Sequence, residues 1–338
     1  MVTLREIRSW HRPLVDTALL CVVLLLVSAV GLALDQRLIN GEAAWAKPAK
    51  FALSITVYNL TLAWLLHLSH RWRRLGWWMG TAVAVATAAE MALIITQVVR
   101  GRMSHFNSET VFDAAVYSAM GTMIGGLWVA TFVIAVLLMF QRLRDRSTTW
   151  AIRIGVWIAL AGMAVGPLMT APTPAQREEL VDGGGVDVLG AHTVGLPDGG
   201  PGLPFVGWST VAGDLRVGHF VGIHGLQAMI LLAFLLVLLA SRVPRLSDER
   251  ARTRVVAVLG AAYALLTALT VWQALRGQSV VAPDALTLAA LVALGMATAL
   301  GLVWALHVSS RQSDEEEACG SSSTYTTSST RAGASTRP

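Results

Sequence analysis

The chain has 338 residues, of which 54% are apolar and only 14% are charged, and its mean hydropathy is +0.59. Soluble proteins carry about a quarter charged residues, so this composition excludes an ordinary soluble domain and predicts a membrane protein. The formal net charge of +5 does not indicate a nucleic-acid partner, because the basic residues stand in short segments between apolar runs. Cys21 and Cys319 predict neither a disulfide framework nor a cysteine metal site.

Apolar runs long enough to cross a bilayer as helices recur along residues 1–308. Eight such runs lie near 14–34, 49–67, 77–99, 113–140, 151–171, 217–240, 254–275 and 284–307. We therefore expect an all-α, polytopic bundle of about eight transmembrane helices. The first run follows several arginines, as a signal peptide does, but it is longer than the apolar part of one and is interpreted as an uncleaved anchor.

Basic residues divide unevenly between the two sets of connecting segments. Eighteen of the Lys and Arg residues lie in the N-terminus, the second, fourth and sixth connections or the tail, and eight lie in the remaining segments. The positive-inside rule then predicts that both termini are cytoplasmic and that the 172–213 loop is extracytoplasmic. The Ala-, Arg- and Gly-rich composition is typical of bacteria, so we expect a bacterial inner or plasma membrane. The Ser/Thr-rich residues 309–338 predict a disordered cytoplasmic tail.

The second and third runs carry ionisable residues. Lys47 and Lys50 open the second run, where they either face a site or extend toward the membrane surface. Glu90 lies near the middle of the third run, with Gln97 two turns further along the same face. A buried glutamate is costly, so we interpret Glu90 as a proton carrier or the partner of a histidine, with a structural hydrogen-bonding role as the alternative.

Two outer segments look like parts of a binding site. Arg100, His105 and Asn107 stand at the mouth of the fourth run, where an ordinary polar turn is the alternative. The Gly/Pro-rich 172–213 loop is long enough to form a lid, with Pro204–Trp208 as its apolar anchor. His192 in this loop has no obvious partner and is interpreted as a surface residue.

The start of the sixth run is the most unusual stretch. Asp214 precedes it, and a continuous helix would place polar side chains on one arc about 140° wide and glycines opposite. The arc comprises Arg216, His219, His224 and Gln227, and the glycine face comprises Gly218, Gly222 and Gly225. On such a helix His219 and His224 are too far apart to hold one ion. Glycines spaced as in Gly218-x-x-x-Gly222 predict close helix packing, and Gly121-x-x-x-Gly125 in the fourth run predicts the same.

Three of these segments together resemble an uncharacterised family of bacterial multi-pass integral membrane proteins. They are Lys47-Pro-Ala-Lys-Phe51, Ser104-His-Phe-Asn107 and Gly213-Asp-Leu-Arg-x-x-His-Phe-x-Gly-x-His-x-Leu-Gln227. The resemblance covers most of the membrane region. It implies a membrane protein and brings no mechanism, because the family has no assigned activity.

Three interpretations of the polar residues remain open, with the bilayer as one partner and no nucleic acid. In the first, haem b or a metal ion is bound by histidines from the candidates His105, His219 and His224, for instance His224 with a histidine from another segment. In the second, a proton-coupled transporter or receptor binds a small anionic ligand, with Glu90 carrying the proton. In the third, the polar groups only join the helices. The ligand-binding candidates are Lys47, Lys50, Glu90, Gln97, Arg100, Asn107, Asp214, Arg216 and Gln227.

Overall fold

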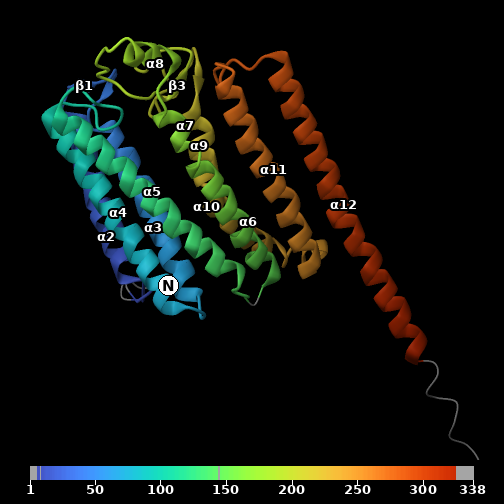
Figure 1. Ribbon diagram of the computed structural model, residues 1–338. Helices are drawn as coiled ribbons and strands as arrows, with labels where there is room; N and C mark the ends of the chain where they lie inside the picture. The colour runs from blue at the N-terminus through green and yellow to red at the C-terminus, as the bar shows by residue number, and fades with distance from the viewer. Residues whose placement is uncertain (1–5, 8, 144, 325–338) are drawn as a thin grey trace, which may run out of the picture.

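The computed structural model describes residues 6–324 apart from 8 and 144, and it is predominantly helical (Figure 1). The helices are α2 (Arg12–Leu34), α3 (Ala46–Leu68), α4 (Arg73–Arg100), α5 (Val111–Met139), α6 (Arg146–Met163), α7 (Gly166–Thr170), α8 (Pro174–Val181), α9 (Leu215–Ile223), α10 (Gly225–Leu239), α11 (Glu249–Leu275) and α12 (Ala285–Thr324), with a 3-10 turn at Pro244–Leu246. Two antiparallel pairs of short strands complete the fold: β1 (Leu38–Ile39) with β2 (Glu42–Ala43), and β3 (Thr193–Val194) with β4 (Gly213–Asp214).

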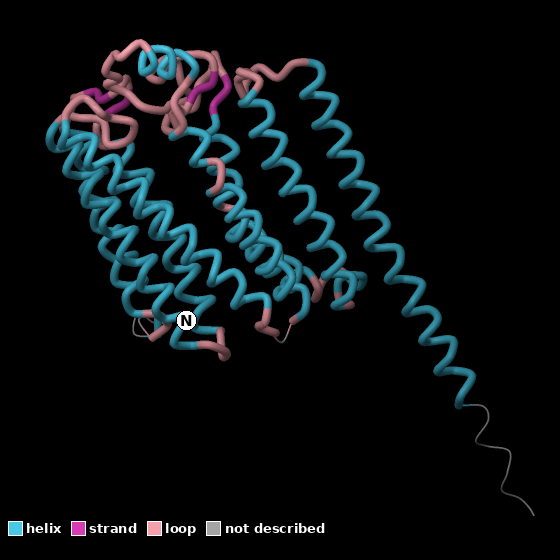
Figure 2. Tube along the Cα trace, viewed as in Figure 1, coloured by secondary structure: helices cyan, strands magenta, loops and turns pink. Residues whose placement is uncertain are grey.

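The helices have the length and composition of membrane spans. Seven spans in the described residues are long and apolar enough to cross a membrane, and the bent pair α9–α10 raises this to as many as eight. The predicted helical architecture is therefore confirmed. The connecting segments fall at two ends of the bundle (Figure 2). The 172–213 loop and β1–β2 lie at one end, and the N-terminus lies at the other (Figure 1).

The bundle has two groups of helices, α2–α5 and α6 with α9–α11, and α12 packs on the outside against α11 (Figure 1). The largest apolar core includes Leu14, Leu62, Ile134 and Val156, which come from α2, α3, α5 and α6. Leu14, Leu62 and Ile134 lie in the half of their helix nearer the end that holds the N-terminus, and Val156 lies close to the middle of α6. The two groups are thus joined tightly at that end, and the space between them lies toward the 172–213 loop.

The sixth predicted span is a broken helix. α9 ends at Ile223, α10 begins at Gly225, and their axes differ by 45°. The break corrects the continuous arc expected for Arg216–Gln227. Its glycines pack closely, as predicted: a Cβ atom at Gly222 would lie 2.4 Å from the Cα atom of Gly162 on α6. Glycines weaken a helix and permit such close contact, which explains why the bend occurs here.

Three further expectations differ from the structure. Nothing among the described residues lies within 4 Å of a Cβ atom built at Gly121 or Gly125, so the predicted packing of this pair is wrong. The expected apolar anchor is also wrong, because Phe205 is 94% exposed. The backbone of α12 continues helically to Thr324, although the sequence predicts disorder from 309. Extending an existing helix needs no new nucleus, and the Glu-rich segment 315–317 favours helix; residues 325–338 lie outside the described part.

Candidate functional site

A cavity of about 1540 Å³ lies between the two groups of helices, under the 172–213 loop. Its walls are largely apolar, with Phe51, Met120, Leu127, Met163 and Phe220 among them. Eight of the twelve predicted site residues line it, although they come from α3, α4, α9, α10 and two connecting segments. These are Lys47, Lys50, Glu90, His105, Arg216, His219, His224 and Gln227.

His105 reaches the cavity because the segment after α4 folds back into the bundle. Its Nε2 atom lies 3.4 Å from Oε1 of Glu90, and its Nδ1 atom lies 3.1 Å from the hydroxyl of Ser104. Glu90 precedes the end of α4 by ten residues, which corresponds to about 15 Å of helix. Burial, together with the charges of Lys47 and His192, holds the pKa of His105 well below its usual value, so its imidazole is neutral.

Glu90 is deeply buried and incompletely bonded. Its side chain belongs to a residue that is 1% exposed, and neither carboxyl oxygen has a hydrogen-bond donor in the part of the chain that the structure describes. Lys47 lies close enough for its charge to act on Glu90, but Lys47 forms no ion pair among the described residues. Its ammonium instead lies 5.9 Å from the ring centre of Phe51. We call Lys47, Glu90 and His105 the open cluster.

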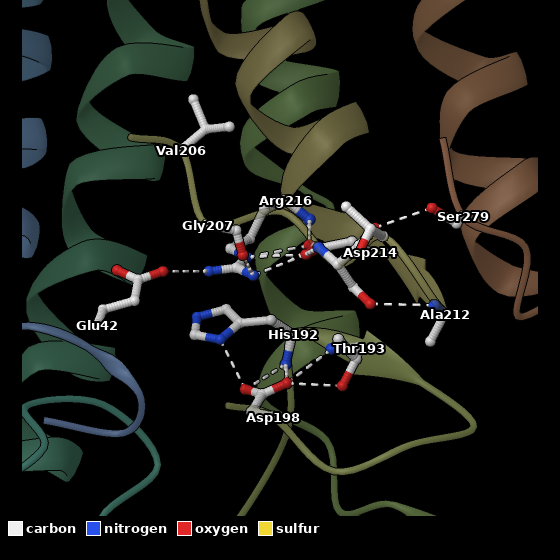
Figure 3. A network of polar contacts seen from close by, with 12 residues as sticks. Glu42, His192, Thr193, Asp198, Val206, Gly207, Ala212, Asp214, Arg216 and Ser279 are labelled. Carbon is white, nitrogen blue, oxygen red and sulfur yellow. Dashed lines mark hydrogen bonds and ion pairs between the residues drawn. The ribbon is translucent and has the colours of Figure 1, made fainter. Parts of the chain in front are cut away.

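A second group of charges is fully paired (Figure 3). Arg216 donates to both carboxyl oxygens of Asp214, with Nη2 2.7 Å from Oδ2, and its Nη1 atom lies 3.6 Å from Glu42. Asp214 also accepts hydrogen bonds from the backbone N–H groups of Ser209 and Arg216, at 2.8 and 2.9 Å. We call Glu42, Asp214 and Arg216 the closed network. It ties the β1–β2 hairpin of one helical group to the loop and helix of the other, and its bonds are those of a structural element.

Lys50 joins this network at its edge. Its ammonium donates to Glu42 at 2.9 Å and to the carbonyl oxygen of Val206 at 3.2 Å. Lys47 and Lys50 lie in the first two turns of the same helix, α3, yet only Lys50 has an ionic partner within the described chain. The sequence pattern does not distinguish the two lysines. The structure does, by their ionic partners within the described chain.

Four predicted site residues do not line the cavity. Gln97 and Arg100 both bond to the buried carboxylate of Asp113 at the start of α5, at 2.8 and 2.5 Å. Asn107 bonds to the backbone of its own segment, at Met103 and Glu109. Asp214 caps α9 and pairs with Arg216. Their contacts account for them as structural residues, because each polar group is satisfied by a neighbour.

His192 was interpreted as a surface residue, and that interpretation is wrong. It lines the cavity, its Nδ1 atom lies 2.7 Å from Oδ2 of Asp198, and its ring lies edge-on to Phe106 at 4.7 Å between centroids. Burial lowers the pKa of His192, and the Asp198 carboxylate opposes this effect only in part. Asp198 follows six residues later in a glycine-rich turn, so the spacing was the one available signal. Tyr117, which sequence reasoning also missed, lines the same cavity, and its hydroxyl has no hydrogen-bond partner in the described structure.

The three remaining polar residues lie along the broken helix. The Nδ1 atom of His219 lies 2.8 Å from the carbonyl oxygen of Gly162, which can only accept, so this nitrogen carries the proton. His224 stands at the break itself, stacked on Phe220. Gln227 donates weakly to Thr61 at 3.5 Å, and its Oε1 atom has no donor among the described residues. No three His, Cys, Asp or Glu side chains in the described chain are grouped so as to hold a metal ion.

Comparisons with known protein families, with curated proteins and with solved structures give no match to this chain. The resemblance to a bacterial membrane protein family therefore stays a prediction. The chemistry of the site has to be argued from its own residues. Within the described part of the chain they provide a cation without an ionic partner, a buried carboxyl group without a hydrogen-bond donor, and neutral imidazoles beside a largely apolar cavity.

Proposed function

We propose that this protein is a multi-pass membrane protein that binds a small anionic ligand in the cavity between its two groups of helices. The observation that carries this proposal is the open cluster, where Lys47 and Glu90 line a cavity of about 1540 Å³ and the carboxyl group of Glu90 has no hydrogen-bond donor in the described chain. A buried polar group without a partner is costly, so its retention favours a ligand that completes its bonds. A ligand carboxylate or phosphate would pair with Lys47.

In this proposal Glu90 is protonated when the anion is bound. A second negative charge beside Lys47 would compete with the ligand, whereas a carboxylic acid would donate a hydrogen bond to it. His105, whose Nε2 atom lies 3.4 Å from Glu90, is placed to exchange that proton. The same pair would supply the coupling proton if the protein moves its ligand across the membrane.

The test is equilibrium binding to the purified full-length protein. The first probes are benzoate, as a short carboxylate, and cis-parinaric acid, as a long fluorescent one, with methyl parinarate as the uncharged control. We expect a carboxylate to bind and its ester to bind at least tenfold more weakly. Lys47→Met should reduce binding of the acid by at least tenfold, because a charge-assisted hydrogen bond contributes about 1.5–3 kcal/mol. The proposal is wrong if neither acid binds, or if binding is the same for the acid and its ester and is unchanged in Lys47→Met.

We further propose that both termini are cytoplasmic and that the open cluster lies near the extracytoplasmic side. Eighteen of the 26 Lys and Arg residues belong to segments at the end opposite the 172–213 loop or to the termini. In a chain without other cysteines, Gly185→Cys should react with an impermeant thiol reagent on intact cells. Ser241→Cys, at the other end of the bundle, should react only after lysis. The reverse pattern would invert the orientation.

A second candidate function, haem binding, is favoured by His219. This residue lines the cavity, and because its Nδ1 atom bonds to Gly162, its Nε2 atom is the one left for an axial bond. Arg216, one turn earlier, could pair with a propionate only by giving up part of the closed network. If haem binds, the purified protein, alone or after addition of haemin, should show a Soret band that His219→Ala removes and His70→Ala leaves unchanged. A spectrum without such a band excludes this candidate.

A further inference from the structure

The cavity is much larger than a short anion requires. Binding sites for compounds of drug size occupy roughly 300–1,000 Å³, and this cavity measures about 1540 Å³. Beyond the open cluster, the residues that line it include Phe51, Met120, Leu127, Phe220 and Ile223, whose side chains offer no hydrogen bonds. A ligand that occupies both regions has a charged head at Lys47 and an apolar body against these walls.

The cavity also has an opening between helices. On α5, Gly121 and Gly125 line the cavity and are exposed, and a Cβ atom built at either would meet nothing within 4 Å in the described chain. Gly166, at the start of α7, lines the same cavity and is similarly open within the described residues. Neither edge therefore carries a side chain that closes the seam at these positions.

Contacts on either side mark the limits of this opening. Toward the N-terminal end of the bundle, α5 meets α6 through the indole of Trp128, which donates to the carbonyl oxygen of Leu160 at 3.1 Å. Toward the 172–213 loop, Tyr117 packs edge-on against Phe106, with 5.8 Å between ring centroids. The opening thus lies in the middle of α5, between Tyr117 and Trp128.

The surface around the opening suits lipid chains better than water. Ile124, Val129 and Phe132 on α5 and Leu168 on α7 are all exposed apolar side chains. In a membrane-spanning bundle these residues face the hydrocarbon region. The opening would then connect the bilayer interior, rather than the aqueous side, with the cavity and with the unbonded carboxyl group of Glu90.

We propose that the ligand is a membrane-dissolved amphiphile, a long-chain carboxylate or phosphate, and that it reaches the open cluster sideways through the seam between α5 and α7. This inference rests on the proposed anion site and adds the class of ligand and its route. The head group passes the glycines of α5 and pairs with Lys47, and the chain stays against the apolar walls. Nothing in this step requires the closed network at the outer mouth to open.

The experiment compares the native full-length protein with two variants. Gly121→Leu/Gly125→Leu places two side chains in the seam, and Gly126→Leu is the matched control, because Gly126 is also exposed and open within the described chain but does not line the cavity. The association rate of cis-parinaric acid is followed by its fluorescence. We expect the double variant to slow association at least tenfold, and the control to stay within twofold of the native chain. If the double variant does not fold, Gly125→Leu alone serves as the test.

Acids with long and short hydrocarbon chains distinguish a failure of this inference from a failure of the proposed function. Parinarate should bind at least tenfold more tightly than benzoate, relative to their free aqueous concentrations, and both should depend on Lys47. If benzoate binds equally tightly and the leucines change nothing, the anion site stands but the lipid ligand and the lateral route are wrong. If neither acid binds, the proposed function fails together with this inference. Inorganic phosphate and a phosphatidic acid, compared in the same way, distinguish a free anion from a lipid head group.

Discussion

The closed network and the open cluster both contribute residues to the lining of one cavity, and each combines a basic side chain with a buried carboxyl group. Asp214 is 2% exposed and receives hydrogen bonds from Arg216 and from the backbone of Ser209. Glu90 is 1% exposed and receives none among the described residues. Two equally buried carboxyl groups therefore differ in their hydrogen bonds within the described chain. Asp214 has several donors, whereas Glu90 has only the contact with Nε2 of His105 at 3.4 Å, which is not a hydrogen bond.

This difference separates a structural role from a functional one. A buried charge whose bonds are all satisfied joins segments of the chain, and its removal leaves the partner charge unpaired. A buried polar group without partners contributes nothing comparable to stability, because the fold bears the cost of removing it from water. We therefore expect substitutions in the closed network to act mainly on stability, and those in the open cluster mainly on binding.

The largest effect is expected at Asp214. Asp214→Ala leaves the Arg216 guanidinium with the carbonyl oxygen of Gly207 and, as an ionic partner among the described residues, only the more distant Glu42. We therefore expect a loss of about 3–5 kcal/mol in the free energy of unfolding. Thermal and denaturant unfolding of the purified protein would measure it. Carboxylate binding, measured at a temperature where the variant stays folded, should change less than twofold. A variant that keeps its stability but loses binding would reverse the roles assigned to the two regions.

Acid should lower the free energy of unfolding through the histidines that line the cavity. Burial lowers the pKa values of His105 and His192 below 6.5, and the positive charges of Lys47 and Arg216 add to the effect. The unfolded chain therefore takes up protons near pH 6.5 that the folded chain does not bind. The stability that each neutral histidine contributes is complete above that pH and is lost below it, by at most about 1.4 kcal/mol per pH unit for each group.

Unfolding measured between pH 7.5 and 5.5 would check that stability falls as the pH falls. His105→Gln should flatten the decline, since it removes one of the groups that cause it. Asp198 acts in the same direction, but only below about pH 3.8. Burial raises the pKa of its carboxyl group, but hydrogen bonds from His192 and Thr193 outweigh this effect and lower it. An unchanged slope in His105→Gln would show that His105 is already protonated, or exposed, in the native protein.

A smaller effect on stability is expected from Glu90→Gln. The amide keeps the size of the side chain and removes a group that is costly to bury, so the free energy of unfolding should stay within about 1 kcal/mol or rise. Asp113→Asn is the matched control, because Asp113 is also buried but bonds to Gln97, Arg100 and Thr110. The control should be clearly destabilised. Equal losses in both variants would mean that Glu90 has a structural partner.

The apolar pattern of the sequence was sufficient to predict the helices, because a long apolar segment in a membrane satisfies its own backbone hydrogen bonds as a helix. It placed Lys47, Glu90 and Arg216 on the correct elements and could not say which of them would be paired. Pairing depends on contacts distant in sequence, such as Arg216 with Glu42. The break at His224 was missed for the same reason. The helix bends where its glycines pack against α6, and no local sequence pattern reveals the position of α6.

The loops were the least predictable part. His192 acquires its role from Asp198 and Phe106, which belong to a turn and to a different connecting segment. Phe205 was expected to anchor the lid because it is apolar, but the lid is held instead by polar contacts such as Lys50 with the carbonyl oxygen of Val206. A glycine-rich loop has too little local preference to fix which of its side chains faces inward.

The smallest effect is expected at Lys50, and it gives the sharpest contrast because Lys47 lies one turn away on α3. Lys50 is partly exposed, and its partner Glu42 is too, with side chains 27% and 34% accessible. An ion pair of this kind contributes about 1 kcal/mol or less, so Lys50→Met should lower stability only slightly. Its ammonium is already bonded to Glu42 and Val206, so binding of cis-parinaric acid should change less than twofold, against at least tenfold for Lys47→Met. If the two variants lose binding equally, both lysines hold the ligand, and Lys50 belongs to the open cluster rather than to the edge of the closed network.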